Sequence, residues 1–454
     1  MNPAYTPAPA TPDLLSQSTP LVSESKMFLK TKTTAVQNGM KQAVSNCQIK
    51  VLLLENINST ALKIFQGEGY QVEHLTKALS EEELIEKIKD VHIIGLRSKT
   101  KITEKVLNAA ENILAIGCFC IGTNQVNLEV AAKKSIAVFN SPFSNSRSVA
   151  ELVLAEIIFL SRQLGDRNNE MHKGVWNKVS KNCYEVRGKK LGIVGYGHIG
   201  SQLSVLAEAL GMQVYFYDVL QLMPLGSAKP VATLQELLSI VDVVTFHVPE
   251  TPDTKEMVGE KEIRALRPGS YLINASRGTV VQIAPLAKAL RDGHLGGAAI
   301  DVYPSEPARN GEGFESELIG CPNTILSPHI GGSTEEAQSM IGIEVGNAIT
   351  KFMSQGSTLG AVNFPQIELR PSNDPSSVRI LFAHNNVPGV LKSINNVLSD
   401  YNVERQTSES KGDLAYLVAD VLIRPGENDA NSILSHLYHT ISALPHGIST
   451  RLIQ

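Results

Sequence analysis

The stretch Leu191-Gly-Ile-Val-Gly195-Tyr-Gly197-His-Ile-Gly200 decides the fold of this chain. Its apolar residues predict a strand, and its Gly-x-Gly-x-x-Gly pattern predicts a tight turn into a helix whose free N–H groups face a pyrophosphate. Residues 212–217 follow as a second strand, and Asp218 comes 18 residues after Gly200, where a carboxylate binds ribose hydroxyls. The combination predicts a Rossmann-type site for NAD rather than NADP, because Asp218 would repel a 2′-phosphate. His198, inside the loop, is predicted to be a positioning residue.

Strands alternate with helices on both sides of this motif, which predicts parallel α/β layers. The motif starts well inside the chain, so residues 48–145 are predicted to form a substrate-binding domain that residues 333–356 complete. Residues 146–332 would be the NAD-binding domain inserted into it. Residues 357–377 have a linker composition, and residues 378–454 follow a βαββαβ order that predicts a separate ferredoxin-like domain.

The composition narrows the possible functions. The 454 residues carry 41 basic and 45 acidic side chains, a formal net charge of −4, and this balance favours neither nucleic acid nor an anionic membrane as a partner. No apolar run reaches the ~20 residues that cross a bilayer. Five cysteines do not make a disulfide scaffold, and no residue spacing indicates a metal site. Residues 1–47 are rich in Pro, Ser and Thr and are predicted to be disordered, and the chain is predicted to be cytoplasmic.

Three later strands each end in one reactive side chain: Arg277, Glu306 and His329. Ligands of open α/β sheets bind at the carboxyl ends of the strands, so these residues are candidates for catalysis. Arg277 can hold a carboxylate in a bidentate fork. His329 can take a hydroxyl proton while nicotinamide takes a hydride, and Glu306 can hold the imidazole in the required tautomer. The set suits oxidation of a 2-hydroxy acid.

The three reactive segments resemble those of the D-isomer-specific 2-hydroxyacid dehydrogenases. The matching motifs are Asn274-Ala-Ser-Arg277-Gly, Asp301-Val-Tyr-Pro-Ser-Glu306-Pro and Ser327-Pro-His329-Ile-Gly-Gly. The resemblance implies that Arg277 binds substrate and that Glu306 pairs with His329, the acid/base. It also implies a set of residues around the NAD, in addition to the three glycines: His198, Ile199, Asp218, Ala275, Ser276, Arg277, Asp301, His329, Ile330, Gly331 and Gly332.

Four further stretches resemble the phosphoglycerate-specific branch of that family. They are Gly95-Leu-Arg97-Ser-Lys-Thr, residues 116–126, Phe143-Ser-Asn-Ser-Arg147-Ser-Val-Ala-Glu151 and Gly174-Val-Trp-Asn-Lys178. The resemblance implies oxidation of 3-phosphoglycerate to 3-phosphohydroxypyruvate, the first step of L-serine biosynthesis, by a homotetramer. Arg97, Arg147 and Lys178 are candidates for holding the substrate phosphate, because a phosphorylated acid needs more cationic groups than Arg277 alone.

The C-terminal segment Leu381-Phe-Ala-His384-Asn-Asn386-Val-Pro-Gly389 resembles an ACT domain, a module that binds amino acids. His384 and Asn386 are candidates for an L-serine site. Glu404 stands where serine-regulated bacterial relatives carry Asn, so it either accepts the ligand ammonium or closes the site.

Two other functions stay open from the sequence. One is a different D-2-hydroxyacid dehydrogenase, such as a glyoxylate or hydroxypyruvate reductase, although the basic residues and the ACT-like segment argue against it. The other is an NAD-sensing binding protein on the same fold, which would need no turnover. Comparing NADH production from several hydroxy acids discriminates among these functions.

Overall fold

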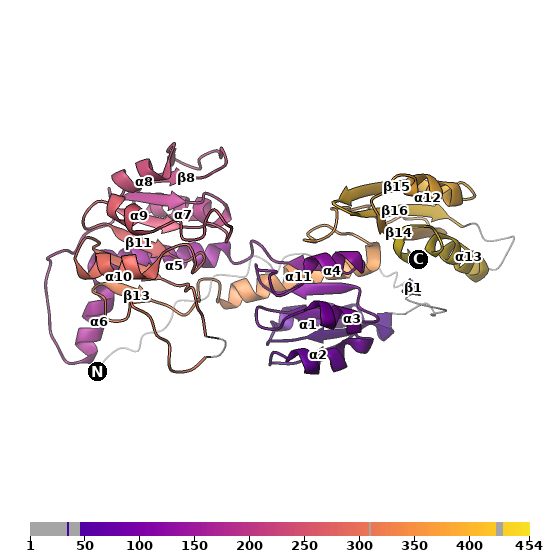
Figure 1. Cartoon of the computed structure of the whole chain (residues 1–454), viewed down its shortest axis with the longest axis horizontal. Coiled ribbons are helices and arrows are strands. Elements are labelled where there is room, and N and C mark those ends of the chain that lie inside the picture. The colour runs from indigo at the N-terminus through magenta and orange to yellow at the C-terminus, as the bar shows by residue number, and fades with distance from the viewer. Residues whose placement is uncertain (1–33, 36–45, 308–309, 424–429) are drawn as a thin grey trace, which may run out of the picture.

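The computed structural model describes residues 34–35, 46–307, 310–423 and 430–454. They form three sheets that follow one another along the molecule, with the long helix α11 (Glu335–Gln355) running through the middle (Figure 1). Two sheets are parallel and the C-terminal one is antiparallel, which confirms the predicted fold class. Within the described residues, no helix is both long and apolar enough to cross a bilayer.

The first parallel sheet lies in the middle of the molecule and has the strand order β3-β2-β4-β5-β6. Its strands are β2 (Lys50–Leu53), β3 (Gln71–His74), β4 (Ile93–Leu96), β5 (Ala115–Cys118) and β6 (Ala137–Asn140). The helices between them are α1 (Ser59–Gly67), α2 (Glu81–Lys87), α3 (Glu104–Ala109) and α4 (Leu128–Lys133). The central strands β4 and β5 are buried at every position, as their unbroken apolar runs predict. The Ser80 and Glu83 capping box begins α2.

The second parallel sheet has seven strands in the order β13-β12-β11-β10-β7-β8-β9. Its strands are β7 (Lys190–Val194), β8 (Gln213–Tyr217), β9 (Lys229–Pro230), β10 (Val243–Phe246), β11 (Tyr271–Asn274), β12 (Gly297–Ile300) and β13 (Thr324–Leu326). Its helices are α5 (Ser146–Arg162), α6 (Leu164–His172), α7 (His198–Ala209), α8 (Leu234–Ile240), α9 (Glu260–Ala265) and α10 (Ile283–Arg291). The strand that follows β7 in the chain, β8, pairs on one side of β7, and β10 pairs on its other side. The strand order therefore reverses between β7 and β10, and ligands of open α/β sheets bind at such a switch point.

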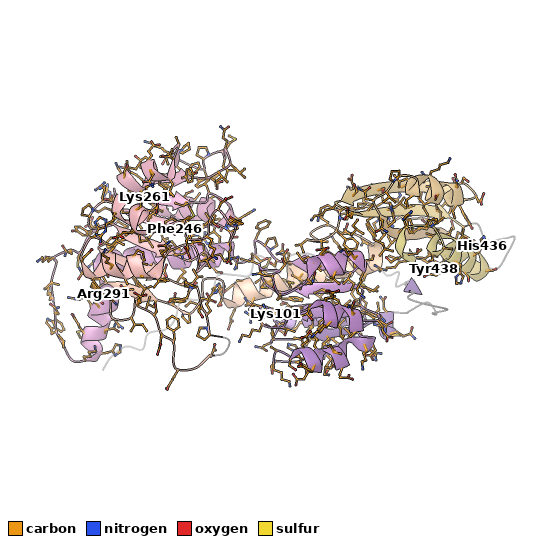
Figure 2. All side chains as sticks on the ribbon, viewed as in Figure 1. Lys101, Phe246, Lys261, Arg291, His436 and Tyr438 are labelled. Atoms are coloured by element: carbon orange, nitrogen blue, oxygen red, sulfur yellow. The ribbon has the colours of Figure 1, made fainter. Side chains whose placement is uncertain are left out.

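The side chains of this second domain follow the pattern of a sheet buried between helices. Phe246 of β10 is fully buried in the sheet, whereas Lys261 of α9 and Arg291 of α10 are on helices at the outside (Figure 2). α11 then leaves this domain and packs on α1, β5 and β6 of the first sheet. The chain therefore crosses between the two parallel sheets twice, as the insertion topology predicts.

The C-terminal sheet has the order β17-β14-β16-β15, and β14, β15, β16 and β17 pair antiparallel. Its elements are β14 (Ser377–Asn385), α12 (Val390–Leu398), β15 (Asn402–Lys411), β16 (Leu414–Leu422), α13 (Ala430–Ser442) and β17 (Gly447–Ile453). This is the predicted βαββαβ order. The prediction of disorder for residues 1–47 falls mostly outside the described residues. Within them, β1 (Thr34–Ala35) pairs with β17, and η1 (Asn46–Gln48) is a turn of 3₁₀ helix.

The connection from α11 to the C-terminal domain is packed against the first sheet rather than free. Val362 donates its N–H to the carbonyl of Val138. The Asn363 side chain accepts the N–H of Val138 and donates to the carbonyl of Ile136, at the beginning of β6. Phe364 is fully buried. The residues with a linker composition therefore hold the C-terminal domain against the first sheet, and one hydrophobic core runs across both. Its members include Phe139, Phe352, Phe364, Leu381, Tyr416 and Ile453.

Candidate active site

The glycine-rich loop between β7 and α7 has the shape that a pyrophosphate requires. Gly195 has φ +91°, and a Cβ there would lie 2.4 Å from the His247 carbonyl oxygen. A Cβ on Gly200 would lie 2.3 Å from the Gly195 carbonyl oxygen. A Cβ on Gly197, in contrast, would meet nothing within 4 Å, so the backbone there faces open space at the N-terminus of α7. The loop therefore fits a dinucleotide phosphate on three separate grounds.

Asp218 lies at the end of β8, beside this loop. Its carboxylate accepts N–H bonds from Tyr196 at 2.8 Å and from Leu220 at 2.9 Å. These bonds orient the carboxylate and leave acceptor capacity for ribose hydroxyls, since a carboxylate offers about four lone-pair directions.

His198 begins α7, and its ring stacks on that of Phe143 with the centroids 3.7 Å apart. Phe143 precedes α5, on the connection from the first sheet, so this stack joins the two parallel domains at the nucleotide loop. Ile199, the next residue, is half-buried. The contact supports the predicted positioning role of His198, and the sequence pattern did not indicate that Phe143 takes part in it.

Arg277 follows β11 in a loop that Asn274 orders. The Asn274 side chain accepts from the N–H and hydroxyl of Ser276 and donates to the Arg277 carbonyl at 3.0 Å. Among the described residues, the Arg277 guanidinium donates one bond, to the carbonyl of Ser276 at 2.7 Å, and it is half-buried. Its remaining N–H groups are left for a substrate carboxylate. Ala275 completes the loop, and the role of Asn274 is one that the sequence did not indicate.

Glu306 and His329 form a pair at the ends of β12 and β13. Their side chains meet with Nδ1 of His329 at 2.8 Å and 3.0 Å from the two carboxylate oxygens of Glu306. Glu306 also accepts the Tyr303 N–H at 3.2 Å. The His329 side chain is 52% exposed. With Nδ1 engaged, Nε2 is the nitrogen that faces away from Glu306 and can exchange a proton with a ligand.

Asp301 holds the loop that carries His329. Its buried carboxylate accepts the Ser327 hydroxyl at 2.6 Å and the N–H groups of Ile330 and Gly331, both at 2.8 Å. His329 has φ +54°, a left-handed conformation that costs a non-glycine residue energy, so the loop needs such anchoring. Asp301 was predicted to line the NAD site, and its observed contacts give it a structural task as well.

The same loop approaches the start of α5 from the other side. A Cβ on Gly332 would lie 2.4 Å from Nδ2 of Asn145, and the Ser148 and Thr334 hydroxyls are 2.8 Å apart. The two chain crossings between the parallel domains therefore touch beside the catalytic pair. Because β11, β12 and β13 are neighbours in the sheet, the topology brings Arg277, Glu306 and His329 to the same edge as the glycine-rich loop. β11, β12 and β13 lie two, three and four strands from β7.

The three predicted phosphate ligands lie on different elements. Arg97 follows β4, with its carbonyl accepting from Gln125 at 2.7 Å. Arg147, in the first turn of α5, forms an ion pair with Glu151 at 2.6 Å. Lys178 is exposed on residues 173–189, which run from α6 along the side of the second domain away from the first sheet (Figure 1). Within one chain, the segment 173–189 thus runs along a different side of the second domain from the one that faces the first sheet.

Comparison with known proteins identifies the architecture. Residues 154–331 match the family model described as "D-isomer specific 2-hydroxyacid dehydrogenase, NAD binding domain". The chain is 55% identical to D-3-phosphoglycerate dehydrogenase 2 of Saccharomyces cerevisiae, over 90% of this chain and 88% of that one. It is 56% identical to the D-3-phosphoglycerate dehydrogenase of Dictyostelium discoideum, over 89% and 97%. The chain belongs to the D-isomer-specific 2-hydroxyacid dehydrogenase family.

A solved member of the family has the same arrangement of parallel domains. The D-lactate dehydrogenase of Aquifex aeolicus, complexed with NAD and lactic acid, superposes with a TM-score of 0.60 and 26% identity, over 70% of this chain and all of that one. As a 2-hydroxyacid dehydrogenase, this protein is an NAD-dependent oxidoreductase. Arg277, Glu306 and His329 are the residues that we assign to its chemistry, and the glycine-rich loop and Asp218 are those that would hold the NAD.

The candidate regulatory residues of this dehydrogenase lie in the C-terminal domain. His384 is buried, donates from Nδ1 to the Asn385 carbonyl at 2.8 Å, and has no partner for Nε2 among the described residues. The Asn386 side chain donates to the Gly412 carbonyl at 3.1 Å. Glu404 falls in a bulge of β15, between the paired residues on either side, and accepts from the Ser372 hydroxyl.

Proposed function

We propose that this protein oxidises 3-phospho-D-glycerate to 3-phosphohydroxypyruvate with NAD as the oxidant, the first step of L-serine biosynthesis. The observation that carries the proposal is the Glu306–His329 pair, beside Arg277 and at the carboxyl edge of an NAD-binding sheet, in a chain that aligns with D-3-phosphoglycerate dehydrogenases over about nine-tenths of its length. The bound nicotinamide supplies the hydride acceptor.

The protein's residues divide the remaining work. Arg277 binds the substrate carboxylate and orients C2. Nε2 of His329 takes the proton of the C2 hydroxyl. Glu306 accepts a hydrogen bond from the Nδ1–H group, which fixes the tautomer and stabilises the imidazolium that forms. In the reverse direction the imidazolium returns the proton to the carbonyl oxygen.

The substrate phosphate distinguishes this activity from that of a glyoxylate or lactate enzyme. Arg97 lies at the carboxyl end of β4 in the first parallel domain, and Arg147 lies in the first turn of α5, where the chain enters the second parallel domain. Lys178 is a candidate contributed by another chain of the predicted homotetramer, since the segment 173–189 runs along a different side of the second domain from the one that faces the first sheet. We further propose that the protein is a homotetramer and that it is located in the cytoplasm.

The test uses the full-length protein and the appearance of NADH. Equal concentrations of 3-phosphoglycerate, D-glycerate and D-lactate should give kcat/KM values in that descending order. Arg97→Ala should lose activity with 3-phosphoglycerate much more than with D-glycerate. Faster turnover of an unphosphorylated acid would assign the protein to another branch of the family, and tight NAD binding without any turnover would favour an NAD-sensing protein.

We also propose that the C-terminal domain binds L-serine as an inhibitor. The unpartnered Nε2 of buried His384 and the nearby Asn386 offer polar groups to an amino acid. Glu404 in its bulge is the third candidate. A serine dose series on the full-length chain and on Glu404→Asn tests this. Inhibition that strengthens in the variant would mean that Glu404 restricts the site, and no inhibition of either protein would leave the domain without this role.

A further inference from the structure

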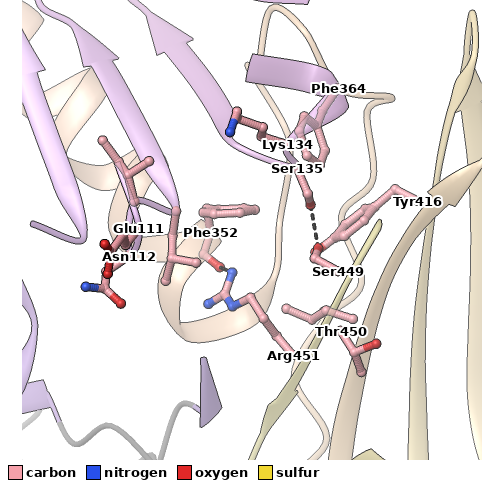
Figure 3. Close-up of a pocket in the computed structure, with 13 residues that line it drawn as sticks. Glu111, Asn112, Lys134, Ser135, Phe352, Phe364, Tyr416, Ser449, Thr450 and Arg451 are labelled. Atoms are coloured by element: carbon pink, nitrogen blue, oxygen red, sulfur yellow. Dashed lines mark hydrogen bonds between the residues drawn. The ribbon is translucent and has the colours of Figure 1, made fainter. Parts of the chain in front are cut away.

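A cavity of about 40 Å³ lies between the C-terminal domain and the first sheet, remote from the catalytic pair (Figure 3). It sits at the C-terminal end of α11, a helix of 21 residues whose other end follows the His329 loop. At 1.5 Å per residue, about 30 Å of helix separates the two. The lining comes from both domains and includes Lys134 and Ser135, Phe352 of α11, and Ser449 and Arg451 of β17.

Arg451 of β17 brings a buried positive charge to this cavity. The residue is 6% exposed, and its guanidinium lies 4.8 Å from the centroid of the Phe352 ring. Two of its nitrogens donate to the carbonyls of Phe352 at 3.5 Å and Met353 at 2.9 Å, in the last turn of α11. Its Nε has no partner within the described part of the chain. No carboxylate of the described residues forms an ion pair with it.

A second buried arginine of the same domain shows what Arg451 lacks. Arg379 of β14 also donates to the end of α11, at the Gln355 carbonyl, but it additionally forms a bidentate pair with Asp420 at 2.7 Å and 2.9 Å. A buried cation without such a partner is costly. Burial lowers the pKa of Arg451, yet an arginine keeps its proton in proteins. The helix carbonyls compensate only part of the charge.

The other polar groups of the cavity suit an oxyanion. Lys134 adds a second cation, and the Ser449 hydroxyl meets that of Ser135 at 2.6 Å across the two domains. Figure 3 shows Arg451 and this serine pair approaching the space between β17 and the end of α11. Glu111, the carboxylate of the lining, is exposed. The walls around these groups are apolar, which strengthens any charge interaction inside.

We propose that this cavity is a binding site for a small oxyanion of the phosphate class, held by the Arg451 guanidinium with Lys134 and the hydroxyl of Ser449. A cavity of about 40 Å³ has room for about three waters, at ~10–15 Å³ each, which suits a single phosphate or phosphoryl group and excludes a nucleotide. The phosphate can be inorganic, or it can be the phosphoryl group of a small metabolite. Its occupation would add contacts between the C-terminal domain and α11.

The test is isothermal titration calorimetry of full-length protein at constant ionic strength, with inorganic phosphate in one arm and 3-phosphoglycerate in the other. An Arg97→Ala/Arg147→Ala background removes the predicted substrate-phosphate ligands. Phosphate binding should persist in this background, and adding Arg451→Gln should weaken it at least about tenfold, equivalent to ~1.4 kcal/mol. Tighter binding in one arm identifies the source of the phosphate.

Two further variants keep the proposal testable if Arg451→Gln does not fold. Arg451→Lys keeps the charge but loses the planar fork and should weaken phosphate binding less than Arg451→Gln. Lys134→Gln changes a residue at the cavity wall and should weaken it as well. Two results would overturn the proposal. One is a phosphate isotherm that the Arg451 and Lys134 substitutions leave unchanged, and the other is the absence of phosphate binding in the Arg97→Ala/Arg147→Ala background.

Discussion

At the scale of single residues, the catalytic function depends on groups that hold other groups in place. His329 is in a left-handed conformation, and the loop around it is tied to Asp301 by three hydrogen bonds. The Glu306 carboxylate contacts Nδ1 of the imidazole and also accepts a hydrogen bond from the backbone N–H of Tyr303. Each reactive side chain is thus oriented before substrate arrives, which is the arrangement that general acid/base catalysis needs.

The Glu306–His329 pair predicts graded losses of activity. His329→Ala should reduce kcat by the ~10²–10⁴-fold typical of a lost general acid/base. Glu306→Gln should reduce kcat less, because the amide still contacts the imidazole but does not stabilise its cation. Steady-state kinetics with separate kcat and KM values checks this. Activity in His329→Ala equal to that of the wild type would remove His329 from the mechanism.

Glu156 of α5 predicts a pH-dependent stability. It is buried, neither carboxylate oxygen has a partner in the described structure, and burial together with the nearby charge of Asp301 raises its pKa to about 8 from 4.5. The folded state therefore binds more protons than the unfolded state between these pH values, so this residue's contribution to stability is full below pH 4.5 and is lost as the pH rises to about 8.

Glu156→Gln should remove that dependence. Relative to wild type, the variant should gain stability progressively from pH 5 to pH 8, by on the order of 1–4 kcal/mol at the upper end. Urea denaturation at several pH values measures the difference, with the exposed Glu312→Gln as the control. A difference that does not change with pH would show that Glu156 is ionised throughout or is equally solvated in both states.

At the scale of secondary-structure elements, the turn from β7 into α7 joins the fold to cofactor binding. The strand is buried, the helix begins at Gly197, and β8 returns beside them to place Asp218. Two of the three glycines are required by contacts within the protein, and the third is surrounded by free space. In this turn, Gly195 and Gly200 are therefore needed for folding, whereas Gly197 is needed only for the ligand.

This separation predicts different outcomes for two alanine substitutions. Gly197→Ala should fold normally, since its Cβ meets nothing within 4 Å, but should weaken NAD binding about tenfold or more by filling the path of the pyrophosphate. Gly200→Ala places a Cβ 2.3 Å from the Gly195 carbonyl and should also lower stability by about 1–3 kcal/mol. Thermal unfolding and NAD titration of both variants check this. Equal stability of the two variants would contradict it.

At the scale of the whole molecule, α11 connects all three units. Its N-terminus follows the catalytic loop, its middle packs on the first sheet, and its last carbonyls accept from Arg379 and Arg451 of the C-terminal domain. The apolar core of the first sheet continues into the C-terminal sheet through Phe352 and Phe364. The C-terminal domain is therefore part of the support for α11 as well as a candidate regulatory domain.

Removing the C-terminal domain should cost stability as well as regulation. A chain that ends at Phe364 exposes Phe352, Phe364 and part of the first sheet, and each large apolar side chain contributes about 1.5–3 kcal/mol when buried. We expect a lower Tm and concentration-dependent aggregation, with NAD binding retained because the NAD-binding domain has its own core. Light scattering and thermal unfolding measure this. Phe352→Ser/Phe364→Ser in the truncated chain should reduce the aggregation, and an unchanged Tm after truncation would contradict the shared core.

The amino-acid sequence by itself determined the features that depend on neighbours along the chain. Gly195, Gly197, Gly200 and Asp218 predicted the NAD site because turn geometry and strand–helix alternation are local. Arg277, Glu306 and His329 were predicted because parallel strands bring their carboxyl ends to one edge, whatever the side-chain details. The βαββαβ order of the C-terminal domain was predicted on the same basis.

Only the tertiary structure decided the features that depend on contacts between distant segments. Four features are of this kind: the anchoring of the His329 loop by Asp301, the stack of Phe143 on His198, the packed connection around Phe364 and the buried charge of Arg451. Each depends on contacts between segments that are distant in the sequence. Burial, and with it the need for a partner, is a property of the assembled core. The sequence of a strand does not show whether a buried arginine has an ion-pair partner, as Arg379 does, or has none within the described part of the chain, as is the case for Arg451.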